Sequence, residues 1–423
     1  MSDVIITPSE LNGVINAPAS KSFSHRAIIC AALSGGKCNI SPLVYSEDVL
    51  ATIDGIKAIG GKVDTYKNGL VVNGFEHSRS SVFINCRDSG STLRFLIPIC
   101  AALGIGAVFK RSLPLSRRPI SQYLEILASA EMSFEFNNDL SIGIKGKLKP
   151  GKFFIPGNIS SQFVSGLLMA LPLLRDDSEI EITCKLESSK YVDMTIEVME
   201  KFGVYVQRTT HGFFIKGNQR YKSIDYTIEG DWSQSAFFMV AGAIGGNVTI
   251  RGLNRNSPQG DREIFEIIKR FGAKVFWEEN ELHVESAPLR GIDIDVSQIP
   301  DLVPVIVILA ANSKSVTNIV NAERLKFKEC DRLDAIYKQM KNLGMDITKS
   351  DCGLTINGKS KYSCGTLWSH NDHRIAMALS IMATNLPQKI KIQDSGCVKK
   401  SYPHFFEDYN SIGGKADVIN MGE

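Results

Sequence analysis

Two kinds of helix alternate along the chain when its hydrophobic and polar positions are followed from end to end. In the first kind, apolar residues recur at helical spacing along one face, a glycine usually follows, and two short alternating segments come next. The pattern reads LATIDGIKAIGGKVDTYKNGLVVNG at residues 50–74, and related stretches begin at residues 123, 196, 264, 333 and 405. One apolar face predicts a helix at the surface of a domain, and the alternating segments predict strands.

The residue at the end of each amphipathic helix recurs about every 70 residues, which is the mark of an internal repeat. Glycine suits a helix end where the backbone needs a positive φ. Glu131 is the copy that lacks glycine. The equivalent junction positions are Gly61, Glu131, Gly203, Gly272, Gly344 and Gly414.

The second kind of helix is apolar nearly all round, which predicts burial inside a domain. Each copy opens on Ser, Trp-Ser, Asp or Asn-Asp, residues typical of a helix start. At roughly 10 to 15 residues, these helices are too short to span a bilayer. The six copies read SHRAIICAAL, STLRFLIPICAALG, SSQFVSGLLMALPLL, WSQSAFFMVAGAIGG, DLVPVIVILAAN and NDHRIAMALSIMATNL.

The chain therefore reads as an α/β (α+β) protein of six βαβ-type units, each with one buried and one surface helix. The last unit lacks a strand, whereas the N-terminal DVIITPSELNGVIN resembles a surplus hairpin. We expect the N-terminus to complete the last unit. The predicted domains are then an inserted one, 19–228, and a second made of 1–18 with 229–423, with crossings near 16–20 and 227–231.

Composition narrows the function. Lys and Arg number 48 against 45 Asp and Glu, and a net charge of +3 argues against a protein that coats nucleic acid or a membrane surface. The N-terminus lacks a secretory pattern, and nine cysteines are scattered without metal-ligand spacing. These features predict a cytoplasmic protein with reduced thiols and no metal.

Polar residues gather at the starts of the buried helices, where free N–H groups and a partial positive charge attract anions. Their recurrence in phase with the repeat gives them weight, since each alone is an ordinary cap or surface charge. The helix starts offer Lys21, Ser22, Arg26, Ser89, Gly90, Ser91, Arg94, Ser160, Ser161, Gln162, Asp301 and Asn371 to Arg374. Loops add Arg118, Ser188, Tyr191 and Lys400.

The segment KFKECDRL adds Lys328, Glu329 and Arg332. If it lies in the first turns of a helix, two cations stand four residues apart, which is unfavourable there. Either Glu329 and Asp331 neutralise them as a surface network, or an anionic ligand lies between them. In all, eight cations accompany only Asp301 and Glu329, so phosphates and carboxylates are the expected ligands. Hydroxyls and Gln162 suit a ligand with sugar-like hydroxyls.

The chain resembles the 5-enolpyruvylshikimate-3-phosphate (EPSP) synthase family. The matching stretches are PASKSFSHRA, SGSTLRFL, RRPI, GNISSQF, IPDLVP, LKFKECDRL, NDHRIAMA and KKSYPHFF, in the family's order from residue 18 to 406. The resemblance implies two similar domains, each of three βαβαββ units around buried helices in an inside-out α/β barrel, with the active site in the interdomain cleft. It also implies a monomer that uses small-molecule substrates and no cofactor.

The implied reaction moves the enolpyruvyl group of phosphoenolpyruvate to the 5-hydroxyl of shikimate 3-phosphate and releases phosphate, on the pathway to chorismate and aromatic amino acids. It proceeds by addition and elimination through a tetrahedral intermediate. By resemblance, shikimate 3-phosphate is held by Ser22, Arg26, Ser160, Ser161, Gln162, Ser188, Tyr191 and Asp301. Phosphoenolpyruvate is held by Lys21, Gly90, Arg118, Arg332, Arg374 and Lys400, with Gln162 and Lys328 nearby.

The chemistry needs an acid and a base, because carbon 3 of the enol gains and then loses a proton. The resemblance makes Asp301 the base for the 5-hydroxyl, and Glu329 with Lys21 the proton carriers. His373 is either a general acid or a residue held by Asp372. Two features depart from the family pattern: Asp88-Ser89 precedes Gly90 where many relatives have Asn-Ala, and Arg324 stands where some relatives have Asn. Gly90 is the small residue expected where the inhibitor glyphosate fits.

Two other functions compete. UDP-N-acetylglucosamine 1-carboxyvinyltransferase shares the fold, but it is expected to carry Lys-Asn at Lys21-Ser22 and a cysteine near residues 110–120, where this chain reads KRSLPLSRRPI. A nucleic-acid clamp needs an extended basic face with aromatic residues between the charges. Here the basic residues of surface helices are balanced by acids, as in REIFEIIKR.

Half of the eight cations fall in each predicted domain, so we expect the two sets to repel when empty and to close on anionic substrates. Small-angle scattering should show a smaller radius of gyration when shikimate 3-phosphate and glyphosate are added together. An unchanged radius would contradict closure.

Overall fold

The computed structural model describes residues 2–75, 80–358 and 362–420. Contacts between Cα atoms divide the chain into two compact units: Ala19–Glu229, here called the inserted unit, and Met1–Pro18 with Gly230–Glu423, here called the split unit. Residue 1 and residues 421–423, which belong to the predicted domain limits, lie outside the described residues.

Within the described residues, each unit contains three sheets of four strands with one repeated order. In every sheet the first two strands of the order are parallel, and the remaining neighbours are antiparallel. This is the pattern of a βαβ crossover followed by a hairpin. It confirms the predicted α/β class and repeat.

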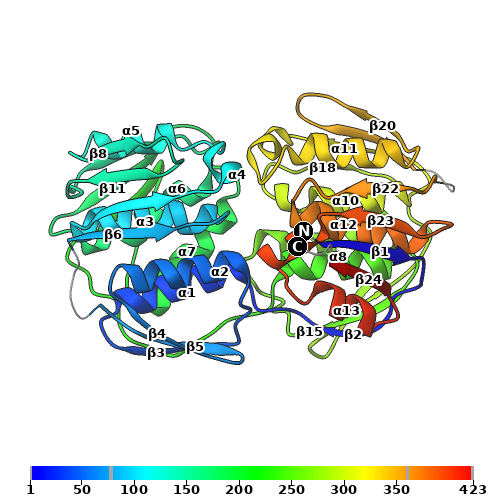
Figure 1. Cartoon of the computed structure of the whole chain (residues 1–423), viewed down its shortest axis with the longest axis horizontal. Coiled ribbons are helices and arrows are strands. Elements are labelled where there is room, and N and C mark those ends of the chain that lie inside the picture. The colour runs from blue at the N-terminus through cyan, green and yellow to red at the C-terminus, as the bar shows by residue number, and fades with distance from the viewer. Residues whose placement is uncertain (1, 76–79, 359–361, 421–423) are drawn as a thin grey trace. The chain divides into compact units, whose positions relative to one another are not determined.

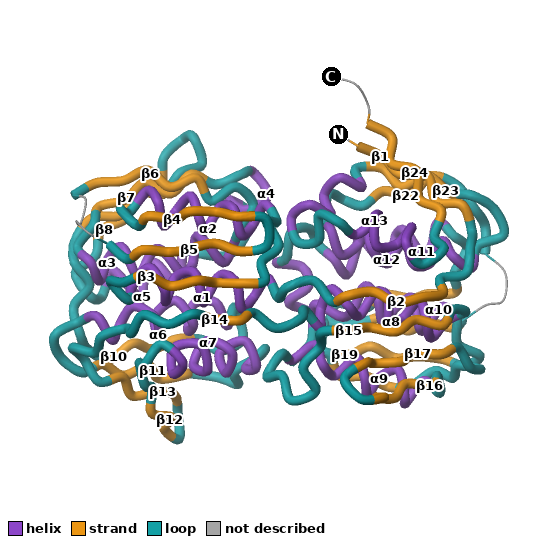
Figure 2. Tube along the Cα trace, turned by 90° about the horizontal axis from the view of Figure 1, so that it is seen from below, coloured by secondary structure: helices purple, strands orange, loops and turns teal. Residues whose placement is uncertain are grey.

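The strands of the inserted unit form three sheets, and Figure 2 shows the strands of the first sheet lying side by side. They are β14 (Tyr226–Thr227), β3 (Lys37–Ser41), β5 (Gly69–Asn73) and β4 (Lys62–Tyr66); β6 (Ser81–Asn85), β7 (Gly106–Lys110), β9 (Ile142–Lys145) and β8 (Ser133–Phe136); and β10 (Lys152–Ile155), β11 (Ser178–Ile182), β13 (Gly212–Ile215) and β12 (Gln207–Thr209).

The split unit repeats the arrangement. Its sheets are β2 (Asn12–Asn16), β15 (Asn247–Arg251), β17 (Glu281–Glu285) and β16 (Lys274–Glu278); β18 (Asp293–Asp295), β19 (Val316–Val320), β21 (Leu354–Asn357) and β20 (Asp346–Lys349); and β22 (Thr366–Trp368), β23 (Ile390–Gln393), β1 (Ser2–Thr7) and β24 (Lys415–Asn420).

The N-terminal segment completes two sheets and forms no hairpin. Strand β1 lies between β23 and β24, with Val4 opposite both Ile392 and Val418, so the N-terminus completes the last unit as predicted. Strand β2 instead runs parallel to β15 in another sheet, so the predicted hairpin is wrong. Without the N-terminal segment, the sheet of β23 and β24 and the sheet of β15 would each lack one strand. Because β1 joins the first and β2 joins the second, the backbone hydrogen-bonding groups of both sheets are paired. Strand β14 does the same for the first sheet of the inserted unit.

The apolar helices are buried along nearly their whole length, whereas the amphipathic helices, here called the outer helices, bury one face and expose the other. Figure 1 shows both kinds in each unit. All nine residues of α10 are buried, as its sequence VPVIVILAA demands. The buried helices are α1 (Lys21–Leu33), α3 (Gly90–Leu103), α6 (Ser161–Ala170), α8 (Trp232–Ile244), α10 (Val303–Ala311) and α12 (His373–Met382). The outer helices are α2 (Glu47–Ala58), α5 (Ser121–Ala128), α7 (Ser189–Lys201), α9 (Ile264–Phe271), α11 (Arg332–Asn342) and α13 (Phe405–Ser411), and a short α4 spans Leu113–Ser116. Within the described residues, no helix has both the length and the hydropathy that a membrane crossing requires.

Several buried helices begin earlier than their apolar runs predict. Helix α1 starts at Lys21, before the expected Ser24, and the cap of α3 is Ser89, whose hydroxyl accepts a hydrogen bond from the Thr92 amide. The cap of α8 is Asp231, before the expected Trp-Ser pair. Polar residues can form a first helical turn because the free end of a helix faces polar surroundings. The first apolar residue of such a helix therefore lies about one turn after the true start of the helix.

Two caps are as predicted and one is not. Ser160 caps α6 and Asp372 caps α12 through hydrogen bonds to the amides of Gln162 and Arg374. Asp301 does not cap α10, because it lies in a 3₁₀ turn, η3 (Pro300–Leu302), that precedes this helix.

The junctions between amphipathic helix and strand adopt the positive φ that their glycines suggested. Gly203, Gly272 and Gly344 have φ of 78°, 106° and 77°. Two predicted positions are wrong by one residue, since Gly60 and Gly413, at 109° and 96°, adopt this conformation in place of Gly61 and Gly414. Each pair is Gly-Gly, so the sequence did not distinguish the two members. Glu131 takes the same conformation without being glycine, with φ of 65°.

Replacing Glu131 by glycine should stabilise the inserted unit. A left-handed non-glycine residue is strained by about 1 kcal/mol or more, and the greater flexibility of glycine in the unfolded chain offsets part of the relief. The ion pair of Glu131 with Lys149 is exposed and contributes little. Chemical denaturation should show a gain of about 0.5–1 kcal/mol in Glu131→Gly.

Gly344→Ala is the matched control in the split unit. A Cβ there would be no closer than 3.4 Å to Ser363 Oγ, so space is sufficient and only the backbone conformation opposes it. This variant should lose about 1 kcal/mol. A loss of stability in Glu131→Gly would contradict the assigned strain.

Candidate active site

Arg26 organises the start of α1 in the inserted unit. Its side chain is buried, its Nε donates to Thr195 Oγ1 at 2.7 Å, and its two Nη atoms donate to the backbone oxygens of Ser22 and Tyr191 at 2.8 and 2.9 Å. The guanidinium also lies over the Phe95 ring. Burial lowers the pKa of Arg26 to about 10, so it remains charged at neutral pH. Arg26 thus ties the predicted substrate residues Ser22 and Tyr191 together.

Lys21 lies one turn before Arg26 and is partly buried. Its Nζ is 2.7 Å from Asp48 Oδ2 at the start of α2. Ionic pairing with a partly buried carboxylate fixes the direction of the long lysine side chain, which otherwise would move freely.

Gly90 begins α3 beside two arginines. A Cβ built on Gly90 would lie 2.7 Å from Arg94 Nη1 and 3.0 Å from both Nη atoms of Arg118. Arg94 Nη1 donates to Gln162 Oε1 at 2.7 Å, and Gln162 Nε2 donates to Ser91 Oγ at 2.9 Å. A side chain at Gly90 would have to displace these guanidinium groups, which explains the glycine without reference to backbone angles.

The remaining predicted residues of this unit stand at the starts of α6 and α7. Ser161 is the first residue of α6 and is buried, and Ser160 caps it. Ser188 precedes α7 with a left-handed φ of 52°, a conformation that places Tyr191 in the first turn of that helix. The structure therefore brings Arg26, Ser22 and Tyr191 together, and separately Gly90, Arg94, Arg118 and Gln162.

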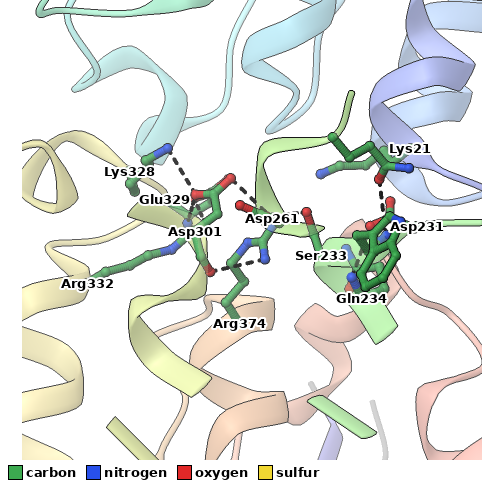
Figure 3. Close-up of polar contacts among 12 residues, drawn as sticks. Lys21, Asp231, Ser233, Gln234, Asp261, Asp301, Lys328, Glu329, Arg332 and Arg374 are labelled. Carbon is green, nitrogen blue, oxygen red and sulfur yellow. Dashed lines mark hydrogen bonds and ion pairs between the residues drawn. The ribbon is translucent and has the colours of Figure 1, made fainter. Parts of the chain in front are cut away.

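Asp301 is the centre of a second cluster, in the split unit (Figure 3). Its Oδ1 is 2.8 Å from Arg332 Nη1 and 3.0 Å from Lys328 Nζ, and its Oδ2 is 3.4 Å from Arg374 Nη2. Arg374 Nη1 also donates to the Asp301 backbone oxygen at 3.2 Å. Three cations from two segments of the chain, residues 328–332 and the start of α12, therefore meet one carboxylate.

Arg332 links this carboxylate to two others. Although only 1% of its side chain is exposed, its Nη2 is 2.5 Å from Glu329 Oε2 and its Nε is 2.7 Å from Asp372 Oδ2. Such burial of a guanidinium requires a partner at every nitrogen, and here three carboxylates supply them.

The predicted helical spacing of Lys328 and Arg332 is wrong. The 3₁₀ turn η4 (Glu323–Phe327) ends before Lys328, whose backbone is extended, and α11 begins only at Arg332 with Asp331 as its cap. The alternative of a surface network is right in pairing Glu329 with Arg332, but it is wrong in placing the pair at the surface and in the role of Asp331, which caps α11. The stretch is a loop that curls around Asp301.

Charge pairing sets the protonation of this cluster. Burial raises the pKa of Asp301, but attraction by Arg374, Lys328 and Arg332 outweighs it and holds that pKa well below its usual value. Burial lowers the pKa of Lys328, and Asp301 limits the effect. Burial also disfavours the charged Arg332, yet Asp372, Glu329 and Asp301 together raise its pKa. Asp301 is accordingly ionised at neutral pH.

Asp261 is a member of this cluster that sequence reasoning missed. It is 1% exposed in the 3₁₀ turn η2 (Gly260–Glu263), and the Ser233 hydroxyl donates to its Oδ2. Figure 3 shows it beside Asp301 and Arg374. Burial first, and then repulsion from Asp301, raise the pKa of Asp261 to about 6. The only sequence signal is its place before an amphipathic run, where it resembles an ordinary helix-start acid.

The start of α12 holds three more predicted residues. His373 is its first residue and is buried. Asp372 accepts from the Arg374 amide at 2.8 Å and from Arg332, so it caps the helix and anchors Arg332. Lys400 Nζ donates to the Asn371 backbone oxygen at 2.8 Å.

Cys330 contacts the same carboxylate. Its Sγ is 3.7 Å from Asp372 Oδ2, and burial followed by the charge of Asp372 raises its pKa, so it is an unreactive thiol. Across 2–75, 80–358 and 362–420, no three His, Cys, Asp or Glu side chains are grouped to hold a metal ion.

Comparisons with known proteins agree with one another. The family model of EPSP synthase (3-phosphoshikimate 1-carboxyvinyltransferase) matches residues 5–409. The 3-phosphoshikimate 1-carboxyvinyltransferase of Clostridium perfringens strain 13 is 46% identical over 419 residues, covering 98% of this chain and 99% of the relative. That of Clostridioides difficile strain 630 is 42% identical over the whole of both chains.

The chain belongs to the EPSP synthase family. Membership confirms the predicted resemblance and makes the chain an enzyme that transfers a carboxyvinyl group to 3-phosphoshikimate.

The fold agrees with solved members and with a more distant transferase. EPSP synthase from Acinetobacter baumannii superimposes with a TM-score of 0.85 at 25% identity, covering 99% of this chain and 100% of that one. The enolpyruvyl transferase NikO of Streptomyces tendae, at 15% identity and a TM-score of 0.79, shares the fold over the full length of both chains.

Asp261→Asn should change how stability depends on pH. The folded state holds the Asp261 proton more tightly than the unfolded chain does, so the wild type loses stability as pH rises from about 4 through about 6. The neutral amide has no such loss. Relative to wild type, the variant should gain about 1.4 kcal/mol between pH 5 and pH 8, measured by denaturant unfolding.

The groups that face Asp261 are Asp301, Arg374, Ser233 and Asp231, all of which the variant retains. Asp346→Asn, an exposed change on β20 of the same unit, is the control and should show no comparable gain. Equal pH profiles for wild type and Asp261→Asn would contradict the assigned protonation.

Proposed function

We propose that the residue sets of both units act on one pair of substrates, phosphoenolpyruvate and shikimate 3-phosphate, and that Asp301 is the base of the reaction. The observation that carries this proposal is the meeting of Lys328, Arg332 and Arg374 at the Asp301 carboxylate. Arginine and lysine are the side chains that bind phosphate and carboxylate groups, so the cluster can bind an anion when these cations exchange part of their pairing with Asp301, Glu329 and Asp372 for the ligand.

We assign the binding of shikimate 3-phosphate to residues of the inserted unit and to Asp301 of the split unit. Helix starts supply N–H groups and hydroxyls for its phosphate and ring hydroxyls. Arg26 supports the proposal because its hydrogen bonds hold Ser22 and Tyr191 in fixed positions. The proposed contacts are Ser22, Arg26, Ser160, Ser161, Gln162, Ser188, Tyr191 and Asp301.

Phosphoenolpyruvate carries a phosphate and a carboxylate, and it takes the remaining cations. Arginine binds both groups in a bidentate manner, and lysine binds them as a point charge. The proposed contacts are Lys21, Gly90, Arg118, Lys328, Arg332, Arg374 and Lys400. Gly90 is included because the guanidinium of Arg118, another proposed contact, lies 3.0 Å from a Cβ built on Gly90.

Anion binding would also activate the base. In the substrate-free cluster the pKa of Asp301 is held low, which makes its carboxylate a weak base. When Arg332, Arg374 and Lys328 turn part of their attraction to bound phosphoenolpyruvate, the pKa of Asp301 rises toward the ordinary range. Asp301 would then accept the proton of the 5-hydroxyl only when both substrates are present.

The reaction then proceeds in two steps. The 5-hydroxyl oxygen bonds to carbon 2 of phosphoenolpyruvate while carbon 3 gains a proton, which gives a tetrahedral adduct. Loss of a proton from carbon 3 re-forms the double bond as the bond from carbon 2 to the phosphate oxygen breaks. We assign the carbon 3 proton to Glu329 and Lys21, with His373 as the alternative acid.

The proposal extends to the setting of the enzyme: a monomer in the cytoplasm that needs neither metal nor organic cofactor and binds no nucleic acid. Gel filtration of the full chain, and an assay in the presence of a chelator, would check the oligomeric state and the metal requirement.

Phosphate release on mixing with phosphoenolpyruvate and shikimate 3-phosphate tests the proposal, with UDP-N-acetylglucosamine as the control acceptor. Asp301→Asn should lower kcat by about 10² to 10⁴, because a general base is removed while the shape is kept. Asp293→Asn, an exposed change on β18, should leave kcat unchanged. Turnover of the control acceptor, or full activity in Asp301→Asn, would contradict the proposal.

Inhibition by glyphosate can be measured in the same phosphate-release assay. If the phosphoenolpyruvate contacts are assigned correctly, inhibition should weaken as the phosphoenolpyruvate concentration rises. A dose-response that does not depend on phosphoenolpyruvate would contradict glyphosate binding beside Gly90.

A further inference from the structure

Four buried side chains, none of them among the groups assigned to substrates, form one hydrogen-bonded chain inside the inserted unit. His25 Nδ1 lies 2.7 Å from Thr52 Oγ1, Thr52 Oγ1 lies 2.7 Å from Thr92 Oγ1, and Thr92 Oγ1 donates to Ser89 Oγ at 2.7 Å. None of the four residues is more than 1% exposed. The chain joins three helices, with His25 on α1, Thr52 on α2, and Thr92 and its cap Ser89 on α3.

The positions of the protons in this chain follow from counting donors. Each threonine hydroxyl has a single hydrogen. Because Thr92 donates to Ser89, Thr52 must donate to Thr92, and His25 Nδ1 must then carry the hydrogen donated to Thr52. The other ring nitrogen of His25, Nε2, is buried and has no hydrogen-bond partner in the described structure. Nε2 is therefore unpaired in either tautomer, and the count of donors along the chain places the hydrogen on Nδ1.

The imidazole is neutral, as this arrangement requires. Burial lowers the pKa of His25 well below its usual value, and the neighbouring charges of Lys21 and Arg26 lower it further. A neutral ring with its hydrogen on Nδ1 donates one hydrogen bond, to Thr52, and its Nε2 carries no hydrogen.

Close helix packing brings the hydroxyls within reach. Gly55 lies one turn beyond Thr52 on α2, and a Cβ there would be 2.5 Å from Leu96 Cδ1 of α3. A larger residue would push α2 away from α3 and separate Thr52 from Thr92. The glycine and the two threonines therefore belong to one packing arrangement.

Both ends of the hydrogen-bonded chain, His25 and Ser89, stand next to residues assigned to phosphoenolpyruvate. His25 follows Lys21 by one turn of α1, and Ser89 directly precedes Gly90. The Ser89 hydroxyl also accepts the Thr92 amide at 3.2 Å, so it fixes the first turn of α3. That turn sets the distance from Gly90 to the guanidinium of Arg118, which would lie 3.0 Å from a Cβ at Gly90.

We propose that the chain His25–Thr52–Thr92–Ser89 is a positioning device that holds the starts of α1 and α3 in register, and so sets the affinity of the enzyme for phosphoenolpyruvate. The proposal rests on the proposed function, because it uses the assignment of Lys21 and Gly90 to that substrate. The four side chains touch no substrate in this role. They act through the backbone of the two helix starts.

Thr92→Val tests the proposal with little change of shape. It removes the hydroxyl at the centre of the chain and leaves Thr52 without its acceptor inside the protein. The KM for phosphoenolpyruvate should rise about three- to tenfold, which corresponds to the loss of one buried hydrogen bond. The KM for shikimate 3-phosphate and kcat should change less than twofold.

Thr92→Ser and Thr317→Val are the matched controls. Thr92→Ser keeps the hydroxyl and should retain the wild-type KM. Thr317 on β19 of the split unit is 0% exposed and its Oγ1 has no hydrogen-bond partner in the described structure, so Thr317→Val makes the same chemical change without breaking a chain. Its KM values should equal those of the wild type.

A spectroscopic measurement tests the chain independently of activity. Long-range ¹H–¹⁵N correlation spectra distinguish the two neutral histidine tautomers, and the His25 signals are assigned by their loss in His25→Asn. The wild type should show hydrogen on Nδ1 of His25 across neutral pH. In Thr52→Val, which removes the acceptor, that preference should be lost.

The possible results distinguish failure of the positioning role from failure of the proposed function. An Nε2 tautomer in the wild type, or an unchanged KM for phosphoenolpyruvate in folded Thr92→Val, would overturn the positioning role. Equal increases in both KM values would also overturn it, because they indicate general loosening. Absence of phosphate release by the wild type would instead overturn the proposed function, and the tautomer result would still decide whether the hydrogen-bonded chain exists.

Discussion

A helix that is buried on all sides can carry a polar side chain beyond its first turn only where another protein group bonds to it, and this constraint shapes the whole protein. Among the described residues, six such helices form the centres of the two units; α10 is apolar throughout, and the buried hydroxyls of Ser165 in α6 and Ser380 in α12 each have a partner in the protein. Backbone N–H groups are free only in the first turn, so that turn must meet side chains, water or a ligand. The chain places its chemistry there, and the sheets and outer helices cover the rest.

The two units meet this constraint differently. In the inserted unit, Arg26 and Arg94 are held by neutral groups: a threonine hydroxyl, backbone oxygens and the amide of Gln162. In the split unit, Arg332 is held by three carboxylates. Neutral partners leave the charge of an arginine available to an anion, whereas carboxylates compensate it. The arginine of the split unit is therefore compensated by carboxylates, two of which, Asp301 and Glu329, are proposed to transfer protons.

Burial also explains why one member of the split-unit cluster differs in protonation from its neighbour. Asp301 faces Lys328, Arg332 and Arg374 and stays ionised, while Asp261 lies beside it with fewer cations and takes up a proton more readily. Two carboxylates close together separate their pKa values when only one of them is paired with cations. The same residue type thus serves one role as an ion and another as a hydrogen-bonded acid.

The sequence alone determined the repeat, the buried and outer helices, the sharing of the N-terminus with the last unit, and the family. These depend on periodicity and local chemistry, which a linear pattern records. Only the tertiary structure decided that residues 328–332 form a loop around Asp301, that Asp261 joins that cluster, and that β1 and β2 belong to different sheets. It also converted His25 from an isolated ring into the end of a hydrogen-bonded chain. Each of these depends on partners from 27 to almost 400 positions away, and the strength of a buried charge or hydrogen bond is set by such partners.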